Sequence, residues 1–437
     1  METNLQQGIY DARKLGTVKF GILGLQHLFA MFGATILVPA ITGLNVSGTL
    51  LFAGIGTLIF HFISKWKVPA FLGSSFAFIG GYLSIKQIGM NKGLPEYLSL
   101  DYACIGVCCA GLCYFVMAAL IKWFGSDRVL RYFPPVVTGP MVIAIGLCLS
   151  GSAITSASED WLVSLVAIIV VIVSNMWGRG IVRIVPILLG VAASYGLAAS
   201  MGKVDFTAFH EAAWIGLPVA RENTILAVLD RPDYSLITSS IIAIMPIAFA
   251  TIMEHIGDMC AISGTVGKPF LADPGLHRTL TGDGVATALA SLFGAPANTT
   301  YGENTGVLNI TKVYDPRVIR LAAVFAILLS FCPKFTSLVG MMPAATIGGV
   351  SLILYGMISA VGIRNMVEAS IDFVQMRNII IAALILVIAI GVKYGANDSV
   401  AIGSIHFSGL ALAAIVGILL NAILPHRMDI DIEQYTN

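Results

Sequence analysis

A polar interruption in an otherwise apolar chain reads Asn298-Thr-Thr-Tyr-Gly-Glu-Asn-Thr-Gly-Val-Leu-Asn-Ile-Thr-Lys312. It follows the apolar run 285–293 and places one carboxylate, Glu303, between a glycine and an asparagine. Unpaired backbone groups and ionised side chains cost several kcal/mol each in hydrocarbon, so this stretch must line a protein-walled or water-filled cavity. The interruption therefore predicts a discontinuous helix at a binding site near the bilayer midplane.

The composition of the whole chain is that of a membrane protein. Of its 437 residues, 57% are hydrophobic and only 11% are charged, and the mean hydropathy is +0.88. A soluble chain of this length would carry roughly a quarter of charged residues. The net charge of +1 gives no indication of a nucleic acid partner, and the sequence has no nucleotide-binding motif. We therefore expect an all-α, polytopic membrane protein that does not use ATP to drive transport.

Stretches of about 20 apolar residues mark the expected membrane spans. They lie at 18–40, 47–63, 69–87, 100–122, 132–151, 161–177, 183–201, 235–257, 282–295, 302–313, 317–333, 343–362, 376–394 and 405–424. This gives about fourteen transmembrane segments. Two of them, 282–295 and 302–313, are too short to cross a membrane alone as ordinary helices.

The basic residues orient these spans. With the N-terminus inside, 18 of the 25 Lys and Arg residues fall on the cytoplasmic side and seven fall outside. Cytoplasmic loops of membrane proteins carry such an excess of positive charge. We therefore expect a multi-pass protein of the plasma (inner) membrane, with both termini in the cytoplasm and the long connection 203–233 outside.

Short patterns recur between the two halves of the chain. Gln26-His27 recurs as Glu254-His255, 228 residues later, and the same offset aligns residues 73–76 with residues 301–304. Seven expected spans separate the two copies, and an odd number of spans inverts the second copy in the membrane. The pattern predicts two inverted repeats of seven segments.

Three carboxylates lie in or beside spans where loop placement does not explain them: Glu254, Asp258 and Glu303. Such residues are functional candidates by default. Glu254 and Asp258 are four residues apart and share one helix face, whereas His255 points elsewhere. Two carboxylates away from bulk water cannot both ionise cheaply, so we expect this pair to carry a proton. The alternative is that these acids pair with buried basic groups, but no Lys or Arg lies mid-span.

Ser75 and Phe76 lie in the third expected span, directly after Gly73 and Ser74. A helix break near Gly73 would present hydroxyls, backbone N–H groups and an aromatic face together. A planar heterocycle binds to that combination of groups. For Phe76 alone, ordinary helix packing is the simpler explanation. A binding site is favoured because residues 73–76 align with the polar interruption when the two repeats are superimposed.

The seven cysteines lie within or beside apolar runs, and four of them share the span 100–122. None of the seven histidines lies near that cluster, and the spacing matches no zinc pattern. We expect the cysteines to be small buried hydrophobic residues. No metal ion or other cofactor is expected.

The chain resembles the nucleobase/ascorbate transporter family, most closely its bacterial uracil permeases, over nearly its whole length. The motifs that carry the resemblance are Gln26-His27, Gly73-Ser-Ser-Phe-Ala-Phe78, Glu254-His-Ile-Gly-Asp258 and Glu303-Asn-x-Gly-x-x-x-x-Thr-Lys312. The resemblance implies fourteen segments in two inverted repeats, with segments 3 and 10 broken and carrying short antiparallel β-strands. It also implies a core part at about 18–122 and 235–333 and a gate part at about 129–201 and 343–424.

The resemblance further implies roles for individual residues. Glu254 and Glu303 would hydrogen-bond a pyrimidine, Phe76 and Tyr301 would flank its ring, and the backbone at Ser75 and Gly302 would assist. Tyr355 would approach from the gate part, and Gln26, His27 and Asn304 would support the site. The uracil permease pattern has His where this chain has Asp258, so we assign proton coupling mainly to Glu254, with Asp258 tuning it.

These expectations describe a proton symporter for uracil or a related nucleobase, embedded in the lipid bilayer, and the resemblance implies a homodimer. Xanthine or urate is the alternative substrate, although purine carriers typically have Gln where this chain has Glu303. An anion transporter or channel of the same architecture would need basic groups or bare helix N-termini at the site. A membrane enzyme would need a metal or nucleophile constellation, which the sequence does not contain.

Overall fold

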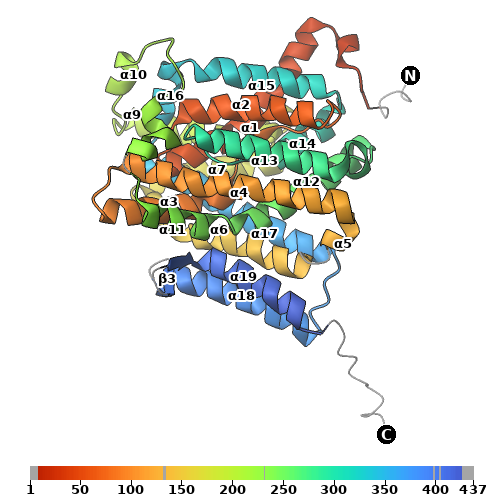
Figure 1. Ribbon diagram of the computed structural model, residues 1–437. Helices are drawn as coiled ribbons and strands as arrows, with labels where there is room; N and C mark the ends of the chain where they lie inside the picture. Colours follow the sequence, from red (N-terminus) through yellow and green to blue (C-terminus); the bar gives the residue numbers. More distant parts are fainter. Residues whose placement is uncertain (1–7, 131–133, 231, 397–398, 403–404, 426–437) are drawn as a thin grey trace.

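The computed structural model describes residues 8–130, 134–230, 232–396, 399–402 and 405–425. It is a bundle of helices that run side by side, with short strands between some of them (Figure 1). Three of the basic residues that oriented the spans, Arg131, Arg231 and Arg427, lie outside the described residues. The C-terminal residues 426–437, expected in the cytoplasm, also lie outside them.

Most of the bundle consists of apolar helices. These are α1 (Thr17–Thr42), α2 (Val46–Ile63), α4 (Glu96–Phe124), α6 (Pro135–Ser158), α7 (Trp161–Trp177), α9 (Pro186–Ser200), α11 (Tyr234–Ile244), α12 (Ile247–Val266), α13 (Leu276–Leu292), α15 (Pro316–Ser330), α17 (Ala344–Glu368), α18 (Met376–Gly395) and α19 (Gly409–Ile423). Shorter helices are α3 (Ile79–Asn91), α5 (Ser126–Leu130), α8 (Ile181–Ile184), α10 (Thr207–Glu211), α14 (Gly302–Thr311) and α16 (Pro333–Gly340).

Single turns and strands complete the described chain. The turns are η1 (Ala12–Leu15), η2 (Phe76–Phe78), η3 (Arg221–Asn223), η4 (Ile225–Asp230) and η5 (Leu271–Gly275). The strands are β1 (Leu72–Ser74), β2 (Asn298–Thr300), β3 (Ser399–Ile402) and β4 (Ile405–Ser408), and they form two antiparallel pairs, β1 with β2 and β3 with β4.

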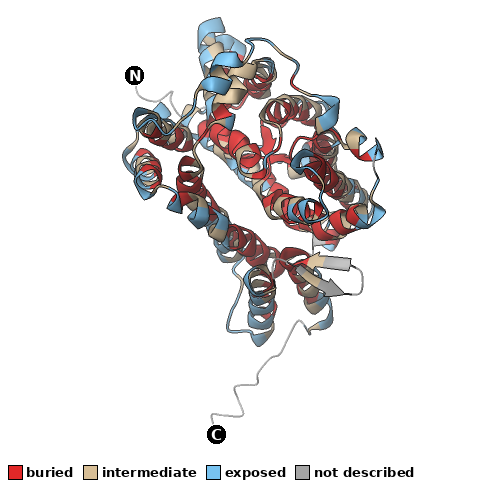
Figure 2. Ribbon diagram, turned by 90° about the vertical axis from the view of Figure 1, so that its left-hand side faces the viewer, coloured by how far each residue is buried: buried red, intermediate tan, exposed pale blue. Residues whose placement is uncertain are grey.

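The expected membrane class is confirmed. Among the described residues, seven helical stretches, with α11 and α12 counted as one, are long and apolar enough to cross a membrane, or eight if the bent pair α15 and α16 is one span, and three shorter apolar helices accompany them. Buried residues lie where the helices face one another and exposed residues lie on the outside (Figure 2). The outside carries large apolar side chains such as Leu112, Val116 and Trp123, as a surface in contact with lipid requires.

Sequence signals explain where several helices begin. The Asp160 carboxylate accepts hydrogen bonds from the backbone N–H groups of Leu162 and Val163 at the start of α7. Asp233 does the same for α11, and Asp315 caps α15 with Pro316 in its first turn. These short polar side chains satisfy N–H groups that the first turn of a helix leaves unpaired.

The span expected at 235–257 consists of two helices. Helix α11 ends at Ile244 and α12 begins after Pro246, since proline lacks the N–H that a continuous helix would need. Helix α12 then runs on to Val266, nine residues beyond the expected end, and stops where Gly267 adopts a left-handed conformation.

Other boundaries also differ from the expectation, and two of them show a change of structure. The span at 317–333 ends at Ser330, and the chain bends by 85° into α16, which the apolar pattern did not separate. The last helix begins at Gly409 instead of 405, because residues 405–408 form strand β4. The expectation that the cysteines are buried is confirmed for Cys104 and Cys148 and wrong for Cys260, which is exposed on α12; the other four are half-buried.

Helix packing forms two groups of close neighbours. Helix α13 packs against α2 and α4, and α15 packs against α1 and α2. Helix α17 packs along α6 and α7, and α18 packs along α6 and α19. Helix α12 contacts members of both groups, including α4, α14, α6 and α19. The largest buried cluster joins both groups through residues such as Phe78, Tyr82 and Tyr355.

Candidate functional site

The strand pair β1–β2 joins the two polar stretches of the chain. Leu72 pairs with Thr300, Gly73 with Thr299 and Ser74 with Asn298, and all of these residues are buried. Two further backbone hydrogen bonds extend the ladder, from Ser75 N to Ala297 O (2.8 Å) and from Tyr301 N to Phe71 O (3.0 Å). The pairing satisfies extended backbone inside the bundle, where unpaired groups would be costly.

Tyr301 fastens the strand pair to helix α1. Its hydroxyl donates to the Ser74 carbonyl oxygen (2.8 Å) and accepts from Thr35 Oγ1 (3.3 Å). Only glycine fits beneath its ring at position 73, because a Cβ there would lie 2.5 Å from Tyr301 Cε2. The Tyr301 side chain is 4% exposed and belongs to a buried cluster with Phe71 and Met31.

Helix α14 starts directly after this pair, with Glu303 in its first turn. Tyr301 occupies the position before the helix and makes no side-chain cap, and Gly302 is exposed. On the opposite strand, Ser75 precedes the turn η2, which begins with the half-buried ring of Phe76. Because the strands are antiparallel, η2 starts at one end of the pair, beside Ala297, and α14 starts at the other end, beside Phe71; helix α12 contacts both.

Helix α12 brings the other two expected carboxylates to the same region. The hydroxyl of Thr300, the last residue of β2, donates a 2.7 Å hydrogen bond to Asp258 Oδ2. Glu254 lies one turn earlier on α12, and α12 packs against α14, whose first turn carries Glu303. The side chains of all three acids are partly accessible. The structure therefore gathers the three carboxylates that the sequence selected.

The Gln26-His27 motif supports α14 from helix α1. Asn304 Nδ2 donates to the His27 carbonyl oxygen (3.0 Å) and lies 3.1 Å from His27 Nδ1, and both side chains are fully buried. Buried polar atoms nearly always have a partner. Five buried polar atoms of the described residues in and around the strand pair make no hydrogen bond with the protein: Gln26 Oε1, His27 Nε2, Ser75 Oγ, Thr299 Oγ1 and Asn304 Oδ1.

Tyr355 occupies a different part of the bundle. It is 2% exposed in helix α17, which packs along α6 and α7. Its backbone oxygen lies against Gly146 of α6, where a Cβ would clash with it. Tyr355 is therefore a buried residue of the contact between α6 and α17, whereas the other expected site residues lie on the elements around the strand pair.

Sequence reasoning missed Asp283. His255 points away from the three carboxylates, as expected, and its Nδ1 lies 3.0 Å from Asp283 Oδ2 with both side chains 0% exposed. The two atoms are close, but their orientation does not meet hydrogen-bond geometry, and neither makes another hydrogen bond. Asp283 was overlooked because it lies at the edge of an expected span, whereas α13 begins seven residues earlier, at Leu276. Asp101 on α4, 2% exposed, was overlooked for the same reason.

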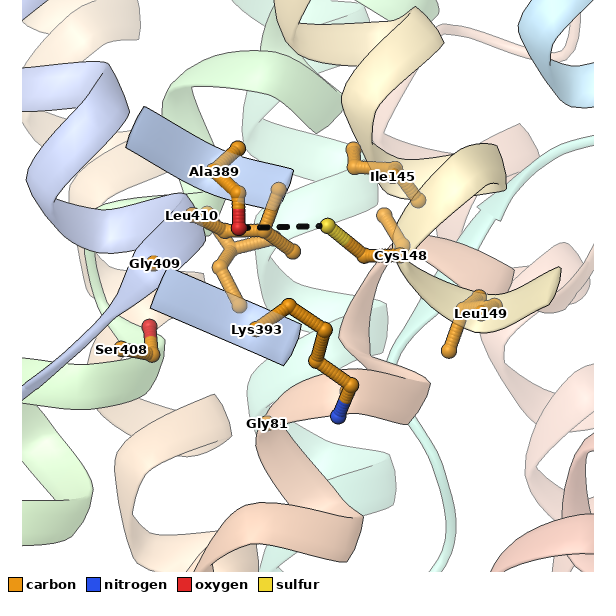
Figure 3. A pocket seen from close by; sticks show the side chains of 12 residues that line it. Gly81, Ile145, Cys148, Leu149, Ala389, Lys393, Ser408, Gly409 and Leu410 are labelled. Atoms are coloured by element: carbon orange, nitrogen blue, oxygen red, sulfur yellow. Dashed lines mark hydrogen bonds between the residues drawn. The ribbon is translucent and has the colours of Figure 1, made fainter. Parts of the chain in front are cut away.

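A small cavity lies between α3, α6, α12, α18 and α19, with η2 and the end of β4 at its edge (Figure 3). It measures about 20 Å³, room for about one water molecule, and Gly81, Leu149 and Leu410 are among its lining residues. Cys148 Sγ donates to the Ala389 carbonyl oxygen (3.5 Å) across it. None of the expected site residues lines this cavity, so it is a packing gap at the contact between helix groups.

Known proteins resemble this chain along most of its length. A family model described as "Permease family" matches residues 19–397. The uracil permease of Bacillus caldolyticus is 43% identical over 415 residues, which cover 93% of this chain and 92% of that protein. The uracil permease of Escherichia coli (strain K12) is 38% identical over 429 residues, which cover 94% of each.

Solved structures of membrane transporters share the fold. The transmembrane domain of the cyanobacterium bicarbonate transporter BicA superposes with a TM-score of 0.57 at 12% identity, over 95% of this chain and 99% of that one. SLC26A9 superposes with a TM-score of 0.65 at 10% identity, over 95% of this chain and 66% of that one. At these identities the likeness concerns the fold alone.

Proposed function

The chain belongs to the nucleobase/ascorbate transporter family of permeases, and from this premise we propose that it is a secondary active transporter that imports uracil by proton symport. One observation carries the proposal beyond family membership. Asp258 is hydrogen-bonded to Thr300 of the strand pair, Glu254 lies one helical turn from it, and Glu303 lies in the first turn of α14 directly after that pair. Carboxylates at membrane depth are costly unless they serve a substrate or ion path. We assign the chain transport and no enzymatic reaction.

In this proposal the substrate lies against the start of α14 and the start of η2. Carboxylate oxygens of Glu303 and Glu254 accept the ring N–H groups of uracil, which is a planar molecule with alternating donors and acceptors. The half-buried Phe76 offers a ring face, and the backbone at Gly302 offers an N–H group. The Ser75 N–H is bonded to Ala297, so Ser75 assists through its unpaired hydroxyl. Tyr301, whose hydroxyl is bonded to Ser74, flanks the ring mainly as a support for the strands.

Three residues on α1 and α14, Gln26, His27 and Asn304, stabilise the position of α14 on the side away from the substrate. The hydrogen bonds from Asn304 to His27 fix α14 on α1, and Gln26 lies on the same turn of α1. The free oxygens of Gln26 and Asn304 are available to donors at the site. Tyr355 in α17 approaches the substrate when the gate part moves relative to the core part.

The coupling part of the proposal assigns the proton to Glu254. A ligand that binds one protonation state of a carboxylate better than the other must change proton affinity by linkage. Glu254 is proposed to carry the proton and to contact the substrate, which would couple the two events. Asp258, held by the Thr300 hydroxyl one helical turn away, tunes that equilibrium.

We further propose fourteen segments in two inverted repeats of seven, with segments 3 and 10 broken at β1 and β2. The core part comprises about 18–122 and 235–333, and the gate part comprises about 129–201 and 343–424. The two groups of helix neighbours described above support this division. The protein lies in the plasma (inner) membrane with both termini in the cytoplasm, and a homodimer forms through the gate part.

Two other cargoes share this architecture. Xanthine or urate would suit a related permease, but Glu303 stands where purine carriers typically have Gln. BicA is named as a bicarbonate transporter, and an anion carrier would require basic groups at the substrate site. The site proposed here contains three acids, which repel anions.

The test is uptake of radiolabelled uracil into vesicles that contain the purified protein, under an imposed proton gradient. Uracil should accumulate, and an uncoupler should abolish the accumulation. Xanthine, urate and bicarbonate are measured in parallel. If the protein accumulates one of these compounds but not uracil, the proposed substrate is wrong. If uracil still accumulates in the presence of the uncoupler, transport is not driven by the proton gradient.

A further inference from the structure

A short loop beside the bend between α15 and α16 is held rigidly. Gly216 N donates to the Phe331 carbonyl oxygen (3.0 Å), and Lys334 N donates to the Ala213 carbonyl oxygen (3.1 Å). Position 216 requires glycine, because a Cβ there would lie 2.6 Å from the Pro333 ring. Residues 213–217 are thus fixed at the point where α15 ends.

The Lys334 side chain clamps the loop from the other side. Its ammonium group lies 5.4 Å from the centre of the Trp214 ring and 4.8 Å from that of Phe209. The same group donates to the Phe209 carbonyl oxygen (2.9 Å) in α10, which packs beside α16 at one end of the bundle (Figure 1). Cation–π contacts and a charged hydrogen bond together restrict the position of Trp214.

The apolar side chains of this rigid loop are nevertheless exposed. Trp214 is 71% exposed, Ile215 is 83% exposed and Leu217 is 87% exposed. Burial of a large apolar side chain stabilises a protein by about 1.5–3 kcal/mol. Two backbone hydrogen bonds hold this loop in place while three large apolar side chains remain uncovered. The loop is therefore suited to an apolar environment that covers these side chains.

The lipid-facing surface of α15 leads directly to this loop. Val324, Leu328 and Phe331 are exposed at intervals of four and three residues, which places them on one helix face. The last of them, Phe331, accepts the hydrogen bond from Gly216. The exposed apolar surface of the membrane helix and that of the loop are therefore continuous.

We propose that residues 213–217 form an apolar wedge that inserts into the boundary between headgroups and acyl chains of the bilayer. The chemistry of the loop fits that layer, because Trp prefers the membrane interface, where the Lys334 ammonium group can lie beside apolar side chains without entering hydrocarbon. The 85° bend turns α16 away from the direction of α15, so the wedge fixes the membrane depth of that bend. This proposal requires only that the chain spans a membrane, and it does not depend on the substrate.

Fluorescence of Trp214 in reconstituted vesicles tests the wedge. The spectrum of the protein minus that of Trp214→Phe isolates Trp214 from the other four tryptophans. Trp214→Tyr serves as a second subtraction if the Phe variant does not fold. We expect a blue-shifted component that loses most of its intensity when the lipids are brominated near the headgroup, and less when they are brominated at the chain end. Aqueous iodide should quench it weakly.

A tryptophan outside the wedge provides the matched control. Leu229 belongs to the same connection and is 72% exposed, so Leu229→Trp in the Trp214→Phe background reports a residue of similar exposure away from the loop. We expect iodide to quench it more strongly than brominated lipid does. Iodide quenching of Trp214 equal to that of this control would overturn the wedge. Resistance of Trp214 to both quenchers would overturn it as well, because a second copy of the chain would then cover the loop.

Discussion

Nδ1 of His255 lies 3.0 Å from Oδ2 of Asp283, and both side chains are completely buried behind the three carboxylates of the candidate site. This contact joins α12, which carries Glu254 and Asp258, to α13. A buried polar group that loses its neighbour costs about 1–3 kcal/mol. The pair therefore contributes to the position of α12.

The first prediction concerns this pair. His255→Leu and Asp283→Leu should each destabilise the protein, and the double variant should be more stable than the sum of the two losses implies, by about 0.5–3 kcal/mol. Thermal unfolding of the four proteins in detergent measures the difference. His27→Leu combined with Asp283→Leu is the control and should be additive, since His27 bonds to Asn304. Additivity for His255 and Asp283 would show that the two side chains do not interact.

Two neighbouring threonines of β2 give a second prediction. Thr300→Val removes the hydrogen bond to the Asp258 carboxylate and should cost about 1.5–3 kcal/mol of stability if that carboxylate is charged. Thr299→Val is the matched control, because the Thr299 hydroxyl is buried without a hydrogen-bond partner. Thr299→Val should leave the stability of the protein unchanged or increase it slightly. Equal losses in thermal unfolding would mean that the bond to Asp258 contributes nothing.

A third prediction tests direct contact between Glu303 and uracil. Glu303→Gln removes the charge and replaces one of the two acceptor oxygens with an NH₂ donor, so the hydrogen bonds to uracil are mismatched at a cost of about 1–3 kcal/mol. The dissociation constant should rise roughly tenfold. Calorimetric titration of uracil measures it, and Glu368→Gln at the exposed end of α17 should leave the affinity unchanged. Normal affinity in a folded Glu303→Gln protein would reject the contact.

The fourth prediction tests which carboxylate carries the coupled proton. Glu254→Gln cannot release a proton, so it should lose proton-driven accumulation of uracil in vesicles. Asp258→Asn, one turn away on the same helix, should keep it, because Asp258 is assigned a tuning role. The proposal fails at this point if the Glu254→Gln protein accumulates uracil and an uncoupler abolishes that accumulation.

Orientation is the subject of the fifth prediction. A single cysteine at position 221 should react with a membrane-impermeant reagent added to intact cells, since Arg221 is 73% exposed in the connection expected outside. A single cysteine at position 128, in α5, should react only after the cells are opened. The reverse pattern of labelling would invert the topology.

Hydropathy and spacing predicted much of the fold and of the site. Apolar runs located nearly all membrane helices, because the bilayer requires continuous apolar length. The spacing of Glu254 and Asp258 predicted a shared helix face, and the structure places both near Glu303. The short strands were expected only from the family resemblance. Three residues of extended chain carry too little pattern to be recognised by periodicity.

Contacts between distant helices could not be predicted in the same way. Periodicity shows which face of a helix is buried, but it does not show which helix covers that face. The contact between His255 and Asp283 and the fastening of Tyr301 to Thr35 are both of this kind. The bend after α15 was missed because the apolar run continues through Phe331 and Cys332, and the sign that Pro333 gives of a helix break was not used.

Strand β1 cannot pair until β2 has been synthesised, so the site is completed late in the biosynthesis of the protein. Ser74 and Tyr301, whose bond closes this pair, are 227 residues apart. At a synthesis rate of about 5–20 residues per second, the second strand follows the first after roughly 10–45 s. During that interval the backbone of residues 72–74 lacks its partner, and unpaired backbone in hydrocarbon costs several kcal/mol per group. A nascent chain that stops before Asn298 therefore remains incompletely inserted and is open to degradation.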